Sequence, residues 1–262
     1  VDELLVGDPV MLQGRLQGGQ RFTGTYDLGA SCSSFVAALD TVSRYVGTEP
    51  DLRYACVVGV YNMPAYVRPG DAFGYSIFAD GAAAVILERS TAGGKGDGGG
   101  QGDGGPGEGS RYLGGQLLAD GTQWDYVGVY AGGTRQPVTS ELLAAGEYGL
   151  ELLQRLPGDR NVKLWPVVVE RLLTKIGQRA DAVDHYLFTQ INRSVIEEVM
   201  GLLGQPLEKT TTVMDRYGYT GSACIPMAFH TALSEGRISR GDTVVMVASG
   251  AGLAVASAAF VM

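Results

Sequence analysis

The chain has 262 residues, of which 45% are hydrophobic and 18% charged, enough to bury a large core as one large α/β unit or two fused smaller ones. Its formal net charge of −8 and the lack of any Lys/Arg cluster argue against nucleic acid or an anionic membrane surface as the main partner. Three cysteines that lie far apart and only two histidines argue against a disulfide framework and a structural zinc site, and favour a reducing cytoplasm.

The opening segment, residues 1–12, carries Asp2, Glu3 and Asp8 rather than a basic stretch and an apolar core, so no targeting signal is visible. The apolar runs of the chain are too short to span a bilayer. A helix-like opening leads to the first predicted strand, residues 24–28. Because the first residue is Val and this strand comes late, we expect the chain to begin inside a fold rather than at its edge.

A thiol, Cys32, stands where this strand gives way to a predicted helix. The helix prediction rests on apolar side chains that share one face over residues 35–46, with Ser31, Ser33 or Ser34 available as caps. A helix N-terminus gathers unpaired N–H groups and partial positive charge, which favours a thiolate. Cys32 is therefore a candidate nucleophile, and the alternative is a buried cysteine packed as a small hydrophobe.

Two buried strands are predicted after this helix. Residues 54–60 form a short continuous apolar run, in which Cys56 is expected to lie in the core. A turn at residues 80–81 leads into the second strand, residues 82–87.

Residues 92–109 are nearly all glycine with a few charged and polar residues. This composition cannot bury enough apolar area to offset the entropy of ordering it, so we predict a flexible insert. A phosphate-binding loop is the alternative, but no Gly-Lys-Ser/Thr ending or following helix supports it.

The remainder of the chain alternates strands and helices. Strand patterns are predicted at residues 112–119, 126–132, 183–188, 243–248 and 253–261, and helical spacing at residues 142–156, 165–176, 191–203 and 221–234. The alternation indicates an α/β layered fold. Similar strand–helix runs on either side of the insert indicate a duplicated architecture. We therefore divide the chain into a first half at 1–91, the insert at 92–109 and a second half at 110–262.

Four segments, taken in order, resemble the condensing enzymes of the thiolase superfamily, and most closely β-ketoacyl-acyl-carrier-protein synthase III. YDLGASCSSF (26–35) is similar to that family's nucleophile segment and FADGAAAVIL (78–87) to its strand-turn-strand. DRYGYTGSACIP (215–226) is similar to its third active-site loop, and ASGAGLAVASAAFVM (248–262) to its closing Gly-rich loop and strand. The resemblance implies a five-layered α-β-α-β-α fold of two similar halves and a homodimer. It also implies transfer of an acyl group from coenzyme A or an acyl carrier protein onto the cysteine.

On this resemblance Cys32 is the nucleophile, and its N–H forms the oxyanion hole together with the N–H of Ala251. Ser249, Gly250 and Gly252 of the same loop are the expected substrate-binding residues. No permanently bound cofactor is implied, because a coenzyme A or phosphopantetheine thioester is the substrate. No metal, nucleotide or flavin signature appears in the sequence.

Two active-site positions depart from the family pattern. Thr189 stands where the His-Gln-Ala-Asn motif has histidine, and Tyr219 stands where the third motif has asparagine. In the family these two residues stabilise the charge formed when a malonyl thioester loses carbon dioxide, and the histidine helps keep the thiol ionised. Threonine cannot carry positive charge, whereas a tyrosine hydroxyl donates one hydrogen bond. We therefore expect Cys32 acylation to persist and decarboxylative condensation to be severely weakened, with Asn192 and Tyr219 orienting the thioester and Thr189 hydrogen-bonding through its hydroxyl.

The remaining titratable residues are weaker candidates. His185 is expected near the start of its strand and outside the site. His230 is expected as a packed or surface residue, and Cys224 as a core residue.

The family has a strand-helix-strand portion before the nucleophile, and this sequence starts too late to include most of it. We expect either a fragment or another chain that supplies the missing strands. The leading prediction is an acyltransferase of fatty-acid or polyketide biosynthesis. The alternative from another class is a non-catalytic partner subunit of a condensing enzyme. Loss of two polar active-site groups favours that alternative, whereas retention of Cys32 counts against it.

Overall fold

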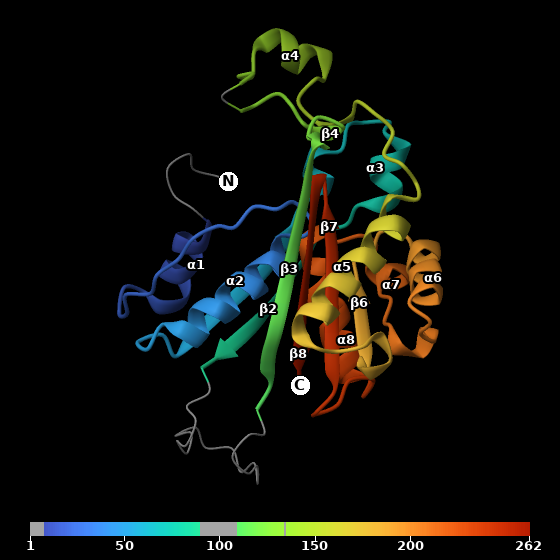
Figure 1. Ribbon diagram of the computed structural model, residues 1–262. Coiled ribbons are helices and arrows are strands. Elements are labelled where there is room, and N and C mark those ends of the chain that lie inside the picture. Colours follow the sequence, from blue (N-terminus) through green and yellow to red (C-terminus); the bar gives the residue numbers. More distant parts are fainter. Residues whose placement is uncertain (1–7, 90–108, 134) are drawn as a thin grey trace.

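The computed structural model describes residues 8–89, 109–133 and 135–262 (Figure 1). Most of the predicted insert, 92–109, lies outside these residues. The strands are β1 (Tyr54–Tyr61), β2 (Gly81–Glu88), β3 (Arg111–Gln123), β4 (Val127–Val129), β5 (Leu150–Leu152), β6 (His185–Phe188), β7 (Thr243–Gly250) and β8 (Gly252–Val261). The α-helices are α1 (Asp8–Gln17), α2 (Ser34–Thr48), α3 (Ala72–Ile77), α4 (Ser140–Ala145), α5 (Arg160–Ile176), α6 (Arg193–Leu202), α7 (Met214–Tyr217) and α8 (Cys224–Ser234). Short 3-10 helices are η1 (Met63–Tyr66), η2 (Ala180–Ala182), η3 (Leu207–Lys209) and η4 (Gly221–Ala223).

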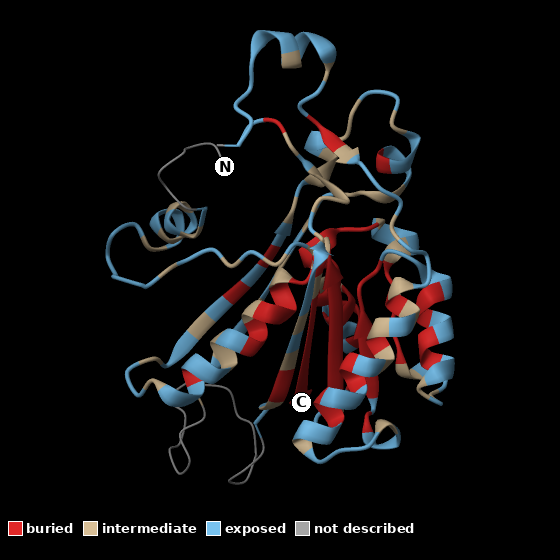
Figure 2. Ribbon diagram, turned by 45° about the horizontal axis from the view of Figure 1, so that its top comes forward, coloured by how far each residue is buried: buried red, intermediate tan, exposed pale blue. Residues whose placement is uncertain are grey.

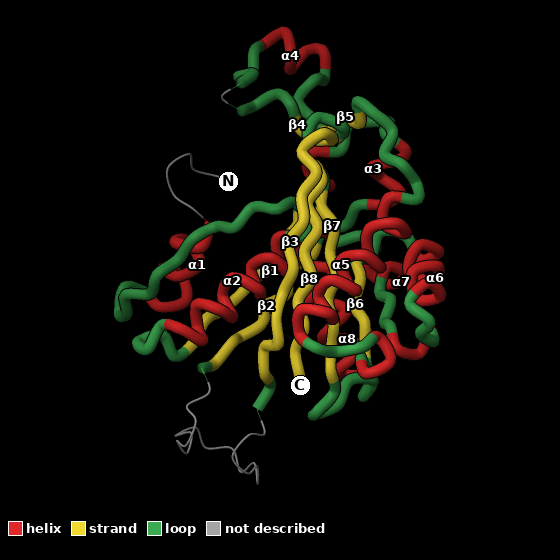
Figure 3. The backbone as a smooth tube through the Cα atoms, in the orientation of Figure 1, coloured by secondary structure: helices red, strands yellow, loops and turns green. Residues whose placement is uncertain are grey.

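The larger sheet has four strands in the order β3-β8-β7-β6, which run side by side in Figure 3. Strands β6 and β7 are parallel, and the other neighbours are antiparallel. Helices α5 and α6 pack on one face of this sheet, where Val245 and Val247 point. Helices α2 and α8 pack on the other face, where Val244, Met246 and Ala248 point. Strand β7 is apolar at successive positions because both of its faces are buried (Figure 2).

Strands β1 and β2 form a second, antiparallel sheet that packs on the far side of α2 and α8. The approach is close, since a β-carbon on Gly59 would lie 2.7 Å from the Ser222 carbonyl oxygen. The layers of the described residues therefore follow the order helix, sheet, helix, sheet. The outer face of β1 and β2 is exposed and includes Cys56, Val60 and Ile86. The prediction of a core position for Cys56 is thus wrong, because among the described residues its strand is covered on one face only.

Most predicted elements are confirmed, with ends that differ by a few residues. The strand predicted at 24–28 is wrong, because that segment has no ladder partner among the described residues. Of residues 126–132, only β4 pairs with another strand. The helical spacing at 142–156 is divided between α4 and β5, because Gly146 adopts a left-handed conformation that ends the helix. Before the predicted turn at 80–81, Phe78 makes only an isolated bridge with Tyr219 in place of the first strand of the strand-turn-strand, and the preceding residues form α3.

Among the described residues, no helix combines the length and apolar character needed to cross a membrane. Within the same part of the chain, no group of three or more His, Cys, Asp or Glu side chains is placed to hold a metal ion.

Candidate active site

Cys32 lies in a tight turn immediately before α2. Ser33 N donates to Ala30 O at 3.1 Å, and Ala30 N donates to Ser34 Oγ at 2.8 Å. Ser31 has a φ of 50°, a left-handed conformation that is uncommon for a residue other than glycine. Ser33 is the N-cap residue, but its hydroxyl donates to Ala30 O rather than accepting from a helical N–H. A serine therefore stands at the cap position as predicted, but its side chain does not cap the helix, and the serines instead stabilise the turn that carries Cys32.

The turn between β7 and β8 lies directly against this segment. A β-carbon built on Gly250 would lie 2.5 Å from Ala30 O, 2.7 Å from Ser31 Cβ and 3.0 Å from the Cys32 backbone nitrogen. Only glycine can lie this close to the segment that carries Cys32, because any side chain would clash with it. The close approach places Ala251, the residue after Gly250, next to the same segment. Strand β7 extends to Gly250 and β8 begins at Gly252, so the turn is shorter than the predicted one.

Thr189 and Ser249 meet at the ends of the neighbouring strands β6 and β7. Ser249 N donates to Thr189 Oγ1 at 3.0 Å, and Ser249 Oγ donates to Asn161 Oδ1 at 3.0 Å. Both Thr189 and Ser249 are buried. The Thr189 hydroxyl thus positions the loop that packs against Cys32. Only the folded structure reveals its hydrogen bond with Ser249.

Two tyrosines lie beside the Cys32 sulfur. The Tyr219 ring is buried and lies 5.9 Å from the Tyr61 ring and 6.0 Å from the Phe78 ring, centroid to centroid. Burial raises the pKa of the Cys32 thiol, whereas hydrogen bonds from Tyr219 and Tyr61 lower it. Burial also raises the pKa of both tyrosines, so their hydroxyls remain neutral donors at neutral pH. Tyr219 and Tyr61 therefore both lower the pKa of the Cys32 thiol, and Tyr61 is a residue of this site that sequence reasoning missed.

Arg160 is a second residue that sequence reasoning missed. It is the first residue of α5, and its positive charge lowers the pKa of Cys32. The sequence holds no motif around Arg160, and the predicted helix began at residue 165. This effect depends on the packing of α5 against the sheet, which no local sequence pattern reports.

Asn192 lies apart from this group. Its side chain is exposed and caps α6, with Oδ1 accepting from Ser194 N at 3.1 Å and from Ser194 Oγ at 2.9 Å. The structure therefore gives this amide a capping role at the surface. Its neighbour Gln190 is buried, and its side chain bonds the backbone of Phe188, Thr211 and Val213.

The two histidines and Cys224 lie outside this group of residues. His185 is buried, and its Nε2 lies 2.9 Å from Thr211 Oγ1; burial lowers its pKa to about 4. His230 is exposed on α8. Cys224 is a core residue as predicted, where it accepts from Gln190 N at 3.5 Å, and burial raises its pKa to about 12. These residues supply no imidazole to Cys32.

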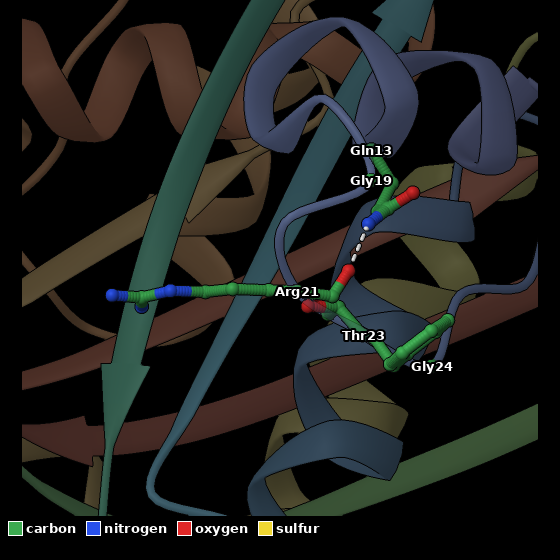
Figure 4. Close-up of a pocket in the computed structure, with 6 residues that line it drawn as sticks. Gln13, Gly19, Arg21, Thr23 and Gly24 are labelled. Atoms are coloured by element: carbon green, nitrogen blue, oxygen red, sulfur yellow. Dashed lines mark hydrogen bonds between the residues drawn. The ribbon is translucent and has the colours of Figure 1, made fainter.

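A surface hollow of about 330 Å³ lies between α1 and the segment that leads to Cys32 (Figure 4). Gln13 Nε2 donates to Arg21 O at 2.9 Å across it, as the dashed line shows. None of the residues that line this hollow is a predicted site residue.

Comparison with known proteins identifies relatives of the chain. Residues 26–99 match the family model for 3-oxoacyl-[acyl-carrier-protein] synthase III, and residues 173–262 match the model for the C-terminal part of the same proteins. A 3-oxopimeloyl-[acyl-carrier-protein] synthase of Rhodothermus marinus is 33% identical, covering 90% of this chain and 63% of the relative. A β-ketoacyl-[acyl-carrier-protein] synthase III of Rhizobium meliloti is 31% identical, covering 96% of this chain and 71% of the relative.

Solved structures agree with these matches. The crystal structure of 3-oxoacyl-(acyl carrier protein) synthase III from Pseudomonas aeruginosa PAO1 superposes with a TM-score of 0.77 at 25% identity. The superposition covers 98% of this chain and 72% of that protein. The chain thus spans about two thirds of the length of the curated relatives it matches.

Proposed function

The chain belongs to the 3-oxoacyl-[acyl-carrier-protein] synthase III family, and we propose that it is a condensing-type acyltransferase in which Cys32 accepts an acyl group. The observation that carries this proposal is the contact of Gly250 with the Cys32 backbone, beside two tyrosine hydroxyls at the sulfur. This arrangement supports a nucleophile with backbone donors close by.

In the proposed acylation, the Cys32 thiolate attacks the carbonyl carbon of an acyl thioester and forms a new carbon–sulfur bond. The bond to the sulfur of coenzyme A or of the carrier phosphopantetheine breaks, and the released thiolate takes a proton from solvent. The N–H groups of Cys32 and Ala251 hold the oxyanion, and Ser249, Gly250 and Gly252 form the loop beside the thioester. Backbone N–H donors are kept when side chains change. The acylation step therefore tolerates threonine at 189 and tyrosine at 219.

The second half-reaction differs from that of the family's histidine-containing members. Thr189 is a hydrogen-bond acceptor for Ser249 N and cannot become a cation, and Tyr219 replaces an amide with a phenol. Loss of one preorganised donor costs about 3 to 4 kcal/mol in comparable sites, so decarboxylative condensation is severely weakened. The acyl group passes to an acceptor that brings its own nucleophile, or to a condensation that does not rely on histidine.

The proposed setting is fatty-acid or polyketide biosynthesis in the cytoplasm, with acyl-coenzyme A or an acyl carrier protein as partner. The proposed assembly is a homodimer with the five-layered fold of the family. No cofactor is bound permanently in this scheme, since the thioester itself is the substrate.

A second candidate function is a non-catalytic partner subunit of an active condensing enzyme. Burial raises the pKa of Cys32, which reduces its thiolate at neutral pH and favours this alternative.

The test is the intact mass of the protein after incubation with short and long acyl-coenzyme A thioesters, with Cys32→Ser as the control. An acyl adduct that is absent from the variant supports the acyltransferase. A folded protein that forms no adduct with any thioester or with acyl carrier protein contradicts it and favours the partner subunit.

A further inference from the structure

Gln190 is fully buried just after the end of β6, and its side-chain amide is engaged at both ends. Nε2 donates to Phe188 O at 2.9 Å and to Thr211 O at 3.2 Å, which uses both of its hydrogens. Oε1 accepts from Val213 N at 2.7 Å. The side chain therefore joins the end of β6 to the segment that leads into α7.

Gln190 also holds the far end of that segment. Its backbone nitrogen donates to the sulfur of Cys224, the first residue of α8, at 3.5 Å. Bonds from one residue thus hold both flanks of residues 211–224. Tyr219 lies within this range, and it belongs with Cys224 to one buried apolar cluster. Cys32 packs against the same cluster, so the placement of the 211–224 segment affects the surroundings of the nucleophile.

The preceding residue, Thr189, holds the closing loop. Its Oγ1 accepts from Ser249 N at 3.0 Å, and the next residue, Gly250, lies against the Cys32 backbone. Two adjacent residues at the end of β6 therefore anchor two separate segments of the site, Thr189 the closing loop and Gln190 the 211–224 segment.

The middle of the 211–224 segment is bonded to the other sheet. Tyr219 N donates to Ile77 O at 2.9 Å, and Ala79 N donates to Tyr219 O at 3.0 Å, just before β2 begins. The segment is thus held between the two sheets, with Gln190 on the side of the larger one. Loss of the Gln190 bonds would leave Tyr219 attached to the β1–β2 sheet and free to move away from the closing loop.

We propose that Gln190 is a positioning residue, which holds the 211–224 segment in place relative to the loop that packs against Cys32. It acts through Tyr219 and does not touch the thioester. The inference rests on the proposed function only for the role of Cys32 as nucleophile. Removal of the amide leaves three buried backbone groups without this partner, and such groups are costly to leave unpaired.

The first measurement is amide hydrogen exchange of Gln190→Met, followed peptide by peptide by mass spectrometry. Methionine has a similar length and lacks the amide. Peptides covering 211–224 are expected to exchange at least about ten-fold faster, because Val213 N loses its acceptor. Peptides of α5 and β7 are expected to keep their rates. An unchanged exchange rate over 211–224 in the folded variant overturns the inference.

The second measurement is the rate of Cys32 acylation at several concentrations of an acyl-coenzyme A. Gln190→Met is expected to lower the maximal rate about two- to ten-fold and to keep the half-saturating concentration within about two-fold. Tyr219→Phe is expected to add less than about two-fold in the Gln190→Met background, because both changes remove the effect of the same hydroxyl on Cys32. An unchanged maximal rate, or full additivity of the two variants, overturns the inference even when exchange is faster.

Gln205→Met is the matched control. Gln205 Nε2 donates to the carbonyl oxygen two residues before it, Leu203 O, at 3.4 Å, as Gln190 does with Phe188 O. Within the described residues this side chain bonds only its own turn, so its loss should change neither measurement.

Gln190→Glu is the conservative variant, since it keeps an oxygen for Val213 N but offers at most one hydrogen in place of two. Exchange over 211–224 should rise about three-fold, and the acylation rate should lie between those of Gln190→Met and the unaltered protein. If Gln190→Met also speeds exchange in α5 and β7, Gln190→Glu carries the test, and an unchanged rate over 211–224 then overturns the inference.

Failure of the proposed function gives a different result. If the unaltered protein forms no acyl adduct, the proposed function is contradicted. The exchange measurement keeps its meaning in that case, and alkylation of Cys32 by iodoacetamide replaces acylation as the rate that is compared between variants. An unchanged alkylation rate in Gln190→Met would then overturn the inference as well.

Discussion

Gly250 lies so close to Cys32 that a β-carbon at this position would come 3.0 Å from the Cys32 backbone nitrogen and 2.5 Å from Ala30 O. The nucleophile turn and the closing loop are far apart in sequence, yet they form one surface. A backbone donor from the closing loop has to come this close to the nucleophile for both to bind a single oxyanion.

Gly250→Ala is expected to push the two segments apart, because the new methyl group meets backbone atoms that cannot move independently. Overpacking of this kind costs about 1 to 3 kcal/mol of unfolding free energy, and Cys32 acylation should fall at least ten-fold. Intact mass against time and thermal denaturation measure the two effects. Gly201→Ala is the control, since Gly201 lies in α6 with open space around it and its substitution should stabilise the helix. Normal acylation by Gly250→Ala would contradict the oxyanion-hole proposal.

Tyr219→Phe removes a hydroxyl beside the Cys32 sulfur and keeps the ring that packs on Tyr61. Since this hydroxyl lowers the pKa of Cys32, its removal raises that pKa and reduces the thiolate at neutral pH. We expect acylation to slow about two- to ten-fold near pH 7 and to recover as the pH rises. The pH dependence of acylation tests this, with the half-exposed Tyr217→Phe as control. A pH-independent loss would indicate a packing defect instead.

Thr189→His restores a group that can carry positive charge at the end of β6. A gain of 3-oxoacyl product from malonyl-acyl carrier protein is expected, and a larger gain when Tyr219→Asn is combined with it. The buried site must accommodate a larger ring, at a cost of about 1 to 3 kcal/mol of stability. Product analysis by mass spectrometry measures the gain. A folded double variant without any product would show that condensation fails here for another reason.

Asn192→Ala is expected to affect the helix rather than the chemistry. The amide caps α6 at an exposed position, so its loss should reduce unfolding free energy by about 0.5 to 2 kcal/mol and leave the acylation rate of Cys32 unchanged. Asn192→Ser, which keeps a capping oxygen, should restore most of the stability. Slower acylation in both variants at unchanged stability would place Asn192 in the site.

Buried His185 predicts acid sensitivity of the fold. Its pKa is lowered to about 4, below the value of about 6.5 expected in the unfolded chain, so the unfolded state binds more protons between these two values. The contribution of His185 to stability is therefore present above about pH 6.5 and is lost as the pH falls toward 4, by up to about 3 kcal/mol. Urea denaturation at several pH values measures this loss. His185→Gln should flatten the pH dependence of the unfolding free energy, whereas His230→Gln, at an exposed position, should not.

Local patterns in the sequence were sufficient for most of the architecture. Continuous apolar runs predicted β1, β2, β6, β7 and β8, because these strands bury side chains in contact with the central helices. The candidate nucleophile stood out in the sequence too, since Cys32 stands just before the helix that the structure has as α2, although the strand expected before it is absent from the described residues. The exposed face of β1 was not predictable, because an apolar side chain such as Val60 has the same pattern whether or not another layer covers it.

The sequence by itself determined the elements, the family and the residues that its motifs carry: Cys32, Thr189, Tyr219 and the loop through Ala251. Only the tertiary structure decided which side chains meet at the sulfur. Tyr61 and Arg160 belong to no motif, and their effect on the pKa of Cys32 arises from the packing of β1 against α2 and of α5 against β7. Asn192 stands at the last position of the second active-site motif, but in the structure its side chain caps α6. Periodicity reports which face of an element is buried, whereas the meeting of side chains from separate elements depends on distances that only packing sets.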